Sequence, residues 1–215
     1  MNTFSVGEAI RFGWELFKKR PWLVIGAFVL TGMLSVSIQF TFGPEEGAPV
    51  NIPAMVLIGI LSVVVGTLAE IGMITFSLRA HDAIDTVGIR DIWNPKLFLP
   101  YVFGRILVGI VVIVGLILLI VPGVILSFGF MFTSYLIVDK GLGPVAAMKE
   151  SWRITKGHKW QLALLGLAFA GLNILGLLAL VVGLLVTIPV TLLAAVHVYR
   201  TLEHKASEMV SSTGV

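Results

Sequence analysis

The stretch ILVGIVVIVGLILLIVPGVILSFGFMFTSYLIV, residues 106–138, contains no charged residue and decides the fold class. One membrane crossing takes about 20 apolar residues in a helix. Together with Leu97–Arg105 before it, the stretch is too long for one crossing and about right for two. Proline suits the first turn of a helix rather than its interior. We therefore expect the break between these two spans at Pro122-Gly123.

Three further apolar segments surround this stretch. Trp22–Phe42 is longer than the apolar part of a cleaved signal peptide, and no clear cleavage site follows it, so we expect a retained span. Pro53–Leu78 is a second span with one charge, Glu70. Trp160–Tyr199 is long enough for two crossings, with a break expected near Thr187-Ile188-Pro189. The sequence thus predicts an all-α, polytopic integral membrane protein with about six transmembrane helices in a single membrane domain, residues 1–215.

Composition supports this class and excludes others. The chain is 57% hydrophobic and only 13% charged, against roughly 25% charged residues in an average soluble domain. A water-soluble core of this size could not hide so much apolar surface. The chain has no cysteine, which excludes disulfides, thiol nucleophiles and thiolate metal sites. Its formal net charge of +3 does not indicate a nucleic-acid partner.

The positions of the basic residues give the orientation. With six spans, all 15 Lys and Arg lie on or near one side of the membrane, and the opposite connections contain none. The first of these opposite connections carries Glu45 and Glu46. Positive residues remain on the cytoplasmic side. We therefore expect a multi-pass protein of the cytoplasmic (inner) membrane with both termini in the cytoplasm.

Tryptophan spacing indicates an internal repeat. Trp14 and Trp22 are eight residues apart, as are Trp152 and Trp160, and a shift of 138 residues superimposes the two pairs. A fainter middle copy surrounds Trp93. We predict three units, each a short amphipathic cytoplasmic helix followed by a transmembrane hairpin; their ranges are 5–78, 87–139 and 143–204. The alternative is coincidence combined with the ordinary enrichment of Trp and Lys at membrane interfaces.

The short helices of the first and third units are basic. Val6–Lys18 and Val145–Lys156 each have one apolar face, with charged side chains elsewhere. One interpretation places them in the inner headgroup region, in contact with anionic phospholipid. The other places them across the cytoplasmic ends of the bundle, and the two are compatible. The candidate headgroup contacts are Lys18, Lys19, Lys149 and Arg153.

The run VPGVILSFGFMFTSYLIVDKGLGPVAAMKESWRITKGHKW, residues 121–160, has a recognisable pattern. Pro-Gly opens a span, Asp139 ends it, and Gly-Pro, Ala, Ser-Trp and Lys-Gly follow. This pattern resembles poorly characterised prokaryotic six-helix inner-membrane families, including the membrane domain fused to some glycerophosphodiester phosphodiesterases. The resemblance covers about residues 98–204 and is looser before them. It implies the fold and little about activity, and we expect no phosphodiesterase domain in this chain.

A search for catalytic chemistry gives little. The four histidines lack metal-ligand spacing, and the sequence has no Gly-rich phosphate loop or nucleophile motif. We therefore expect no catalytic residue, no cofactor and no metal site, and we expect that the protein is not an enzyme.

Glu70 is the charged residue that needs an explanation, because a carboxylate within a span is costly unless it has a partner or is protonated. Antiparallel neighbouring spans would place Arg105 at a similar depth, with Arg79 as the alternative partner. We predict a Glu70–Arg105 ion pair within the membrane. It is either a structural pair that fixes helix register or a site for a proton or cation.

Three classes of function remain. The preferred hypothesis is a non-enzymatic membrane protein that associates with lipid or supports a larger membrane complex, with anionic lipids and a possible homo-oligomer as partners. The alternative is a small transporter or channel using Glu70, against which the scarcity of polar residues in the spans argues. A membrane-embedded lipid enzyme would need a cluster of polar catalytic groups that the sequence does not offer.

Overall fold

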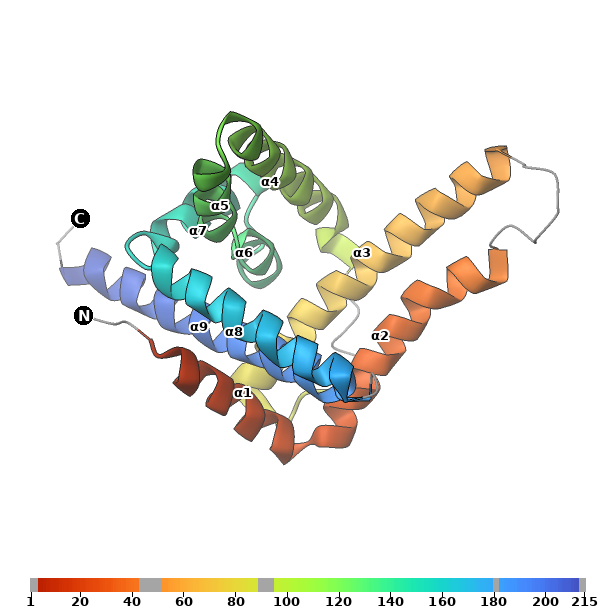
Figure 1. Cartoon of the computed structure of the whole chain (residues 1–215), viewed down its shortest axis with the longest axis horizontal. Coiled ribbons are helices and arrows are strands. Elements are labelled where there is room, and N and C mark those ends of the chain that lie inside the picture. The colour runs from red at the N-terminus through yellow and green to blue at the C-terminus, as the bar shows by residue number, and fades with distance from the viewer. Residues whose placement is uncertain (1–3, 43–51, 89–94, 180–181, 213–215) are drawn as a thin grey trace.

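The computed structural model describes residues 4–42, 52–88, 95–179 and 182–212, without the side chains of residues 34–42, 209, 210 and 212. This part of the chain is built from helices joined by short turns (Figure 1). The helices are α1 Val6–Lys19, α2 Pro21–Phe42, α3 Ile52–Ala83, the 3-10 helix η2 Pro95–Leu97, α4 Phe98–Leu118, α5 Ile120–Gly129, α6 Thr133–Lys140, α7 Pro144–Thr155, α8 Lys159–Leu178 and α9 Leu184–Ser212.

Five helical segments among the described residues have the length and composition of membrane spans, namely Ile52–Ala83, Pro95–Leu118, Ile120–Lys140, Lys159–Leu178 and Leu184–Glu208. The second joins η2 to α4, and the third joins α5 to α6. Helix α2, 22 residues long, is a sixth apolar helix, and its described side chains cover Pro21–Met33. The expected all-α, polytopic membrane architecture is therefore confirmed.

The two breaks inside the long apolar stretches differ from each other. Helix α4 ends at Leu118 and α5 begins at Ile120, so Pro122 lies in the first turn of α5, as expected. The second break was expected near Thr187–Pro189, and this position is wrong. Helix α8 ends at Leu178, and Pro189 lies inside α9, which begins at Leu184. Gly176 and Gly183 explain the earlier turn, because a side chain on Gly183 would lie 2.5 Å from the Gly176 carbonyl oxygen.

The helices form three hairpins, and the second member of each is the more buried. The hairpins are α2–α3, α4 with α5–α6, and α8–α9, and in Figure 1 the α2–α3 hairpin extends away from the rest of the chain. Helix α3 is buried from Ile71 to Leu78, and α6 buries Leu136–Val138. Helix α9 buries most of its side chains between Val190 and Tyr199. The outer helices α2, α4 and α8 bury few side chains, so their surfaces are left for lipid.

The two short helices pack against the inner helices of other hairpins. Helix α1 packs along α9, and Gly13 permits this contact because a Cβ there would lie 3.0 Å from the Ala194 nitrogen. Helix α7 packs against α6 and the turn before it. At this turn the Ser151 hydroxyl donates to the Gly129 carbonyl oxygen over 2.9 Å and accepts from the Phe132 N–H over 3.2 Å. Each short helix therefore lies on the second span of a different unit.

Helix boundaries follow the spacing seen in the tryptophan pairs. Helices α1 and α7 begin at Val6 and Pro144, and α2 and α8 begin at Pro21 and Lys159. Each pair of starts is separated by the shift of 138 residues that superimposes the tryptophans. The middle copy of the short helix, around Trp93, lies outside the described residues. The repeat as a whole stays a prediction.

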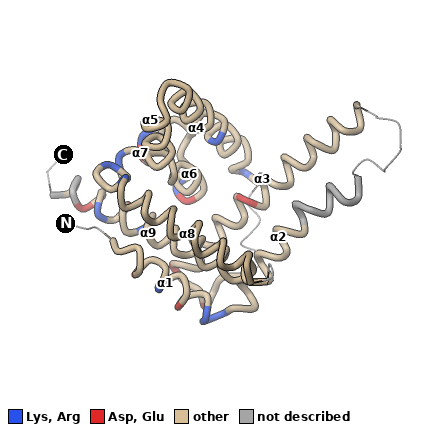
Figure 2. The backbone as a smooth tube through the Cα atoms, viewed as in Figure 1, with Lys and Arg blue, Asp and Glu red and all other residues tan. Residues whose placement is uncertain are grey.

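Basic residues are absent from the far parts of the hairpins. Lys and Arg do not occur in residues 21–78, 106–138 or 160–199. In Figure 2 the far half of α3 is accordingly free of blue. We call the region that includes α1, α7 and the carboxyl ends of α3, α6 and α9 the basic end.

Candidate functional site

The structure brings Glu70 and Arg105 together in an ion pair. Glu70 projects from the middle of α3, and the Arg105 guanidinium donates to its carboxylate from α4. Glu70 lies nine residues from Arg79, and Arg105 lies nine residues from Lys96. At 1.5 Å per residue, each is about 13 Å inside the basic end, close to the middle of a hydrocarbon layer about 30 Å thick.

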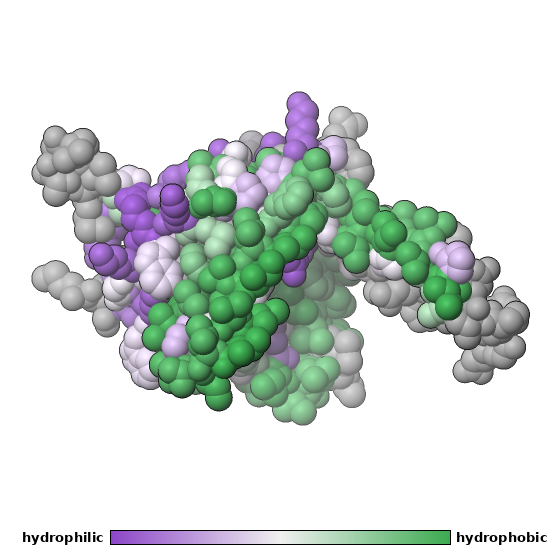
Figure 3. Space-filling view, turned by 90° about the horizontal axis from the view of Figure 1, so that it is seen from above, coloured by the Kyte–Doolittle hydropathy of each residue, from purple (hydrophilic) through white to green (hydrophobic). Residues whose placement is uncertain are grey.

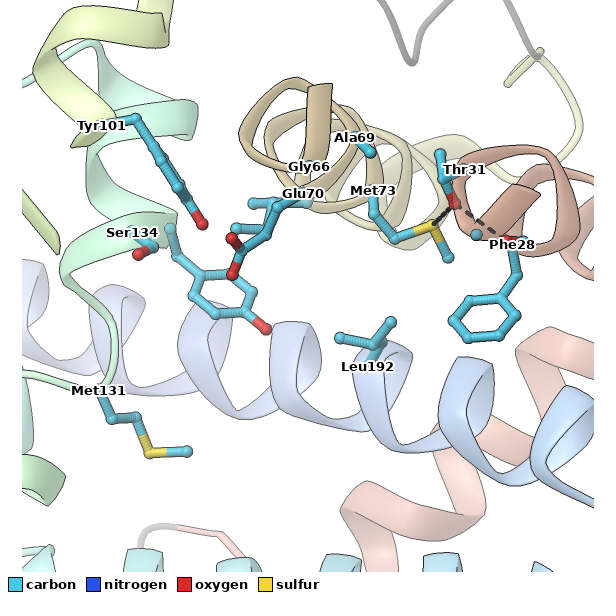
Figure 4. A pocket seen from close by; sticks show the side chains of 13 residues that line it. Phe28, Thr31, Gly66, Ala69, Glu70, Met73, Tyr101, Met131, Ser134 and Leu192 are labelled. Atoms are coloured by element: carbon cyan, nitrogen blue, oxygen red, sulfur yellow. Dashed lines mark hydrogen bonds between the residues drawn. The ribbon is translucent and has the colours of Figure 1, made fainter. Parts of the chain in front are cut away.

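A cavity of about 510 Å³ opens on one side of this pair (Figure 4). It lies between α2, α3, α4, α6 and α9, and Glu70 is its charged residue. Figure 4 shows the Tyr101 hydroxyl pointing toward the Glu70 carboxylate, with Ser134 beside it. The polar lining also includes Thr31 and Tyr135. The cavity therefore combines one carboxylate with hydroxyl groups inside the apolar part of the bundle.

A second cavity, of about 420 Å³, opens on the other side of the pair. Arg105 lines it together with Glu70, and its remaining wall comes from α4, α5 and the start of α6. Glu70, Met131 and Ser134 line both cavities. The ion pair therefore stands at the boundary between two cavities.

Each cavity also contains a buried hydroxyl without a hydrogen-bond partner in the described part of the chain. These are the hydroxyls of Tyr101 in the first cavity and of Thr133 in the second. The two residues are 0% and 3% exposed. An unsatisfied buried hydroxyl costs about 1–3 kcal/mol, which water or a ligand in the cavity would remove.

A separate polar cluster at the basic end holds the inner helices together. Arg200 of α9 bonds to Asp82 of α3 and to Asp139 of α6, each over 2.7 Å. The Tyr199 hydroxyl donates to the same Asp139 carboxylate over 2.8 Å. Lys140 pairs with Glu203 over 2.6 Å. Sequence reasoning missed this cluster, because its partners lie 61 and 118 residues apart in the chain.

The acidic side chains of this cluster are paired with the side chains of Arg200 and Lys140. Within the described residues, no three His, Asp or Glu side chains are grouped so that they could hold a metal ion. His81 and His197, which lie near the cluster, face each other with 3.3 Å between ring nitrogens. The His197 ring also stacks on Phe12, with 4.1 Å between ring centroids.

The four candidate headgroup contacts lie on the surface of α1 and α7, but they differ in their pairing. Lys18, Lys19 and Lys149 are exposed. Arg153 is also exposed, but it bonds to Glu150 over 2.8 and 2.6 Å and donates to the Ala206 carbonyl oxygen over 3.2 Å. The bonded Arg153 guanidinium lowers the pKa of the Glu150 carboxyl. Three of the four cations are thus more available to phosphate than Arg153 is.

An apolar groove of about 430 Å³ lies beside Lys149. Its wall is Leu107 of α4, Phe130 at the junction of α5 and α6, and Val145, Met148 and Trp152 of α7. In the view of Figure 3 hydrophilic side chains lie mainly at the left and along the upper edge, and the rest of the coloured surface is largely hydrophobic. The groove therefore joins an apolar surface to a lysine.

A second apolar groove, of about 360 Å³, repeats this combination between α5 and α8. It is lined by Val121, Ile125 and Phe128 along the spans and by Lys159 and Trp160 at the start of α8. The Lys159 ammonium lies 3.2 Å from the centre of the Trp152 ring, which belongs to the first groove. Lysine and tryptophan at the end of an apolar groove are the residues expected at a lipid headgroup boundary.

Comparison with known proteins places the chain among uncharacterised proteins. A family described as "Protein of unknown function (DUF975)" matches residues 3–206. The uncharacterized protein Rv2560 of Mycobacterium tuberculosis is 27% identical over 232 residues, which cover 94% of this chain and 69% of the relative. The uncharacterized protein Mb2590 of Mycobacterium bovis gives the same values. No solved structure matches. The expected poorly characterised family is confirmed, while the resemblance to the membrane domain fused to phosphodiesterases stays a prediction.

Proposed function

Because this chain belongs to the DUF975 family, to which no function is assigned, we propose a function from its own structure. The protein is a non-enzymatic, multi-pass component of the cytoplasmic membrane that binds anionic phospholipid at its basic end. The observation that carries this proposal is the apolar groove beside the exposed Lys149.

The groove offers one phospholipid both of the contacts it needs. An acyl chain would lie against Leu107, Phe130 and Met148, and its phosphate would reach the Lys149 ammonium. Trp152 lines the same groove, and tryptophan is enriched at membrane interfaces. A lysine near an anionic surface contributes about 1 kcal/mol, so the apolar wall is needed to turn a weak attraction into a site.

Helix α1 adds a second basic contact with the same leaflet. Lys18 and Lys19 occupy its last turn, where the negative end of the helix dipole favours cations, and both are exposed. Trp14 is half exposed on the same helix, and the Lys18 ammonium lies 5.9 Å from its ring centre. The opposite face of α1 buries Ala9, Leu16 and Phe17 against the bundle. The helix thus packs on the spans and presents its cations outward, which combines the two interpretations of the sequence.

The test compares two charge reversals on neighbouring positions. Lys149→Glu removes the cation that lines the groove, and Lys156→Glu makes the same change of charge at an exposed position outside the described cavities. Protein extracted in its native lipid should retain less anionic phospholipid with Lys149→Glu than with Lys156→Glu, as measured by mass spectrometry of the bound lipid. Equal lipid profiles for wild type and Lys149→Glu would refute the proposal.

The cavity beside Glu70 favours a second candidate, a small transporter or channel. A carboxylate that lines a cavity in the middle of a span is a typical feature of ion and solute pathways. Purified protein in liposomes would show ion or solute flux under this hypothesis, and Glu70→Gln would abolish it. Intact liposomes without flux, with the protein correctly inserted, would exclude this candidate.

A further inference from the structure

We infer that Glu70 and Arg105 form the polar centre of an intramembrane binding site for a zwitterion. Its ammonium group would bind the Glu70 carboxylate, and its phosphate or carboxylate would bind the Arg105 guanidinium. This site is separate from the grooves at the basic end, and its occupancy does not depend on them.

The exposure of the pair sets it apart from a structural ion pair in the same molecule. The side chains of Arg105 and Glu70 are 54% and 44% exposed, whereas those of Arg200 and Asp139 are 24% and 15% exposed. Arg200 and Asp139 are closed in by α3, α6 and α9, as expected for a pair that only joins helices. The Glu70–Arg105 pair instead presents about half of each charged side chain to the cavities and the surface around it. A charged pair near the middle of a membrane is expensive to leave so open.

Unpartnered hydroxyls indicate that the cavities are built to hold a polar molecule. Tyr101 lines the cavity on the Glu70 side and Thr133 lines the cavity on the Arg105 side, and both are at least nine-tenths buried. Within the part of the chain that the structure describes, the Thr133 hydroxyl has no hydrogen-bond partner, and the Tyr101 hydroxyl forms no hydrogen bond of normal geometry, its polar neighbour being Ser134. Buried hydroxyls normally find partners. A ligand with polar groups on both sides of the ion pair would satisfy both of them.

The charges of the site select a zwitterion over a single ion. The pair is electrically neutral, so a lone anion would meet the repulsion of Glu70, and a lone cation would meet that of Arg105. A zwitterion replaces one internal pair by two external pairs, and it brings no net charge into the membrane. Guanidinium binds phosphate and carboxylate through two parallel hydrogen bonds. The rings of Tyr101 and Tyr135 in the first cavity suit an ammonium group.

This chemistry has two possible sources. One is the headgroup of a phosphatidylethanolamine-type lipid, whose chains would lie along Val108 and Val112 of α4 in the second cavity. The other is a free zwitterion of the same kind, without acyl chains. Both place the same ammonium and phosphate groups at Glu70 and Arg105, and the experiment below separates them.

Purified protein would be titrated with four probes, with binding followed by native mass spectrometry. The probes are phosphatidylethanolamine, glycerophosphoethanolamine, phosphatidylglycerol and ethanolamine. Because the groove beside Lys149 also binds anionic lipid, the comparison is made in the Lys149→Glu background, where we expect phosphatidylethanolamine to bind at least tenfold more tightly than phosphatidylglycerol. If glycerophosphoethanolamine also binds at the site, the source includes soluble zwitterions; if it does not, the ligand is the lipid. Binding of phosphatidylglycerol or ethanolamine as tight as that of both zwitterions would overturn the inference.

Variants of the two hydroxyls test the site without breaking the ion pair. Tyr101→Phe and Thr133→Val should each weaken phosphatidylethanolamine binding at least threefold. The unliganded variants should melt no lower than the wild type, because each loses an unsatisfied hydroxyl. The weakening caused by Tyr101→Phe and Thr133→Val should be the same in the Lys149→Glu background, so a failure of the lipid groove and a failure of this site give different results. Unchanged binding in both hydroxyl variants would refute the site.

Discussion

Replacing Gly13 by alanine should separate α1 from α9, whereas the same replacement at Gly7 of the same helix should not. A Cβ on Gly13 would lie 3.0 Å from the Ala194 nitrogen and 3.2 Å from the Ala194 Cβ, and it would meet the Val190 carbonyl oxygen still more closely. Two of these three atoms belong to the backbone of α9 and cannot rotate away. A Cβ on Gly7 would have only the Ser5 hydroxyl nearby, at 3.8 Å.

The two substitutions should change the stability of the protein in opposite directions. Alanine in place of an exposed helical glycine stabilises a helix by about 0.5–1 kcal/mol, and Gly7→Ala, in the first turn of α1, should lie at the lower end of this range. Gly13→Ala gains the same propensity but overpacks a close contact, which costs about 1–3 kcal/mol and more where backbone atoms must move. The unfolding temperature of the detergent-solubilised protein should therefore be slightly higher with Gly7→Ala and lower with Gly13→Ala than in the wild type.

Labelling of a single cysteine would locate the effect. The chain has no cysteine, so Ala9→Cys introduces one thiol at a position of α1 that is 0% exposed. The thiol should react slowly with a maleimide in the Gly7→Ala background and faster in the Gly13→Ala background. Equal unfolding temperatures and equal labelling rates in the two backgrounds would refute the close packing of α1 on α9.

Three further predictions address topology, the ion pair and pH. Reporters fused after Glu46 and near Pro122 should lie on the non-cytoplasmic side, and reporters fused after Asp85, Lys149 and Val215 should lie in the cytoplasm. A reporter found on the opposite side at any one of these five sites would contradict the six-span topology. Glu70→Gln should lower the free energy of unfolding, because it strands the Arg105 charge, but by less than the roughly 3–5 kcal/mol of a fully buried pair, since about half of each side chain is exposed. Apolar replacement of both residues should recover much of the loss; a double variant that shows only the sum of the two single losses would argue against coupling. The Arg153 guanidinium lowers the pKa of Glu150, so this carboxylate stabilises the fold above its unfolded pKa of about 4.3 and loses the effect as the pH falls through the lower folded pKa. Glu150→Gln should therefore melt below the wild type at neutral pH, with the two curves converging in acid, and a gap that persists in acid would contradict the pairing.

The sequence was sufficient for features that depend on local composition. Apolar length predicted the spans, and Pro122 predicted the break between α4 and α5, because proline in a first helical turn is a local preference. The meeting of Glu70 and Arg105 also followed from depth alone, since antiparallel neighbours of known length bring residues at equal depth together. Arg153 and Glu150 could have been paired in advance from their spacing of three residues within one helix.

Features that depend on contacts between distant segments could not be predicted in this way. The break between α8 and α9 lies at glycines whose role appears only when the backbones of two helices approach each other, and Pro189 misled the sequence analysis because helices in membranes tolerate proline. The bonds from Arg200 to Asp82 and Asp139 require the order in which the inner helices pack. The unpartnered hydroxyls of Tyr101 and Thr133 emerge only when every neighbouring side chain has been placed.

The packing of α1 on α9 also constrains the order in which the helices can pack together during synthesis. Of the described helices α1 is synthesised before the others, and its partner positions Val190 and Ala194 follow about 180 residues later. At 5–20 residues per second, the ribosome takes roughly 10–40 s to reach them. During this interval the apolar face of Ala9, Leu16 and Phe17 has no partner in α9, and the membrane surface is the place where an amphipathic helix of this kind is stable. Helix α1 therefore docks on α9 long after its own synthesis, so a nascent chain interrupted before α9 would leave α1 attached to lipid instead of to α9.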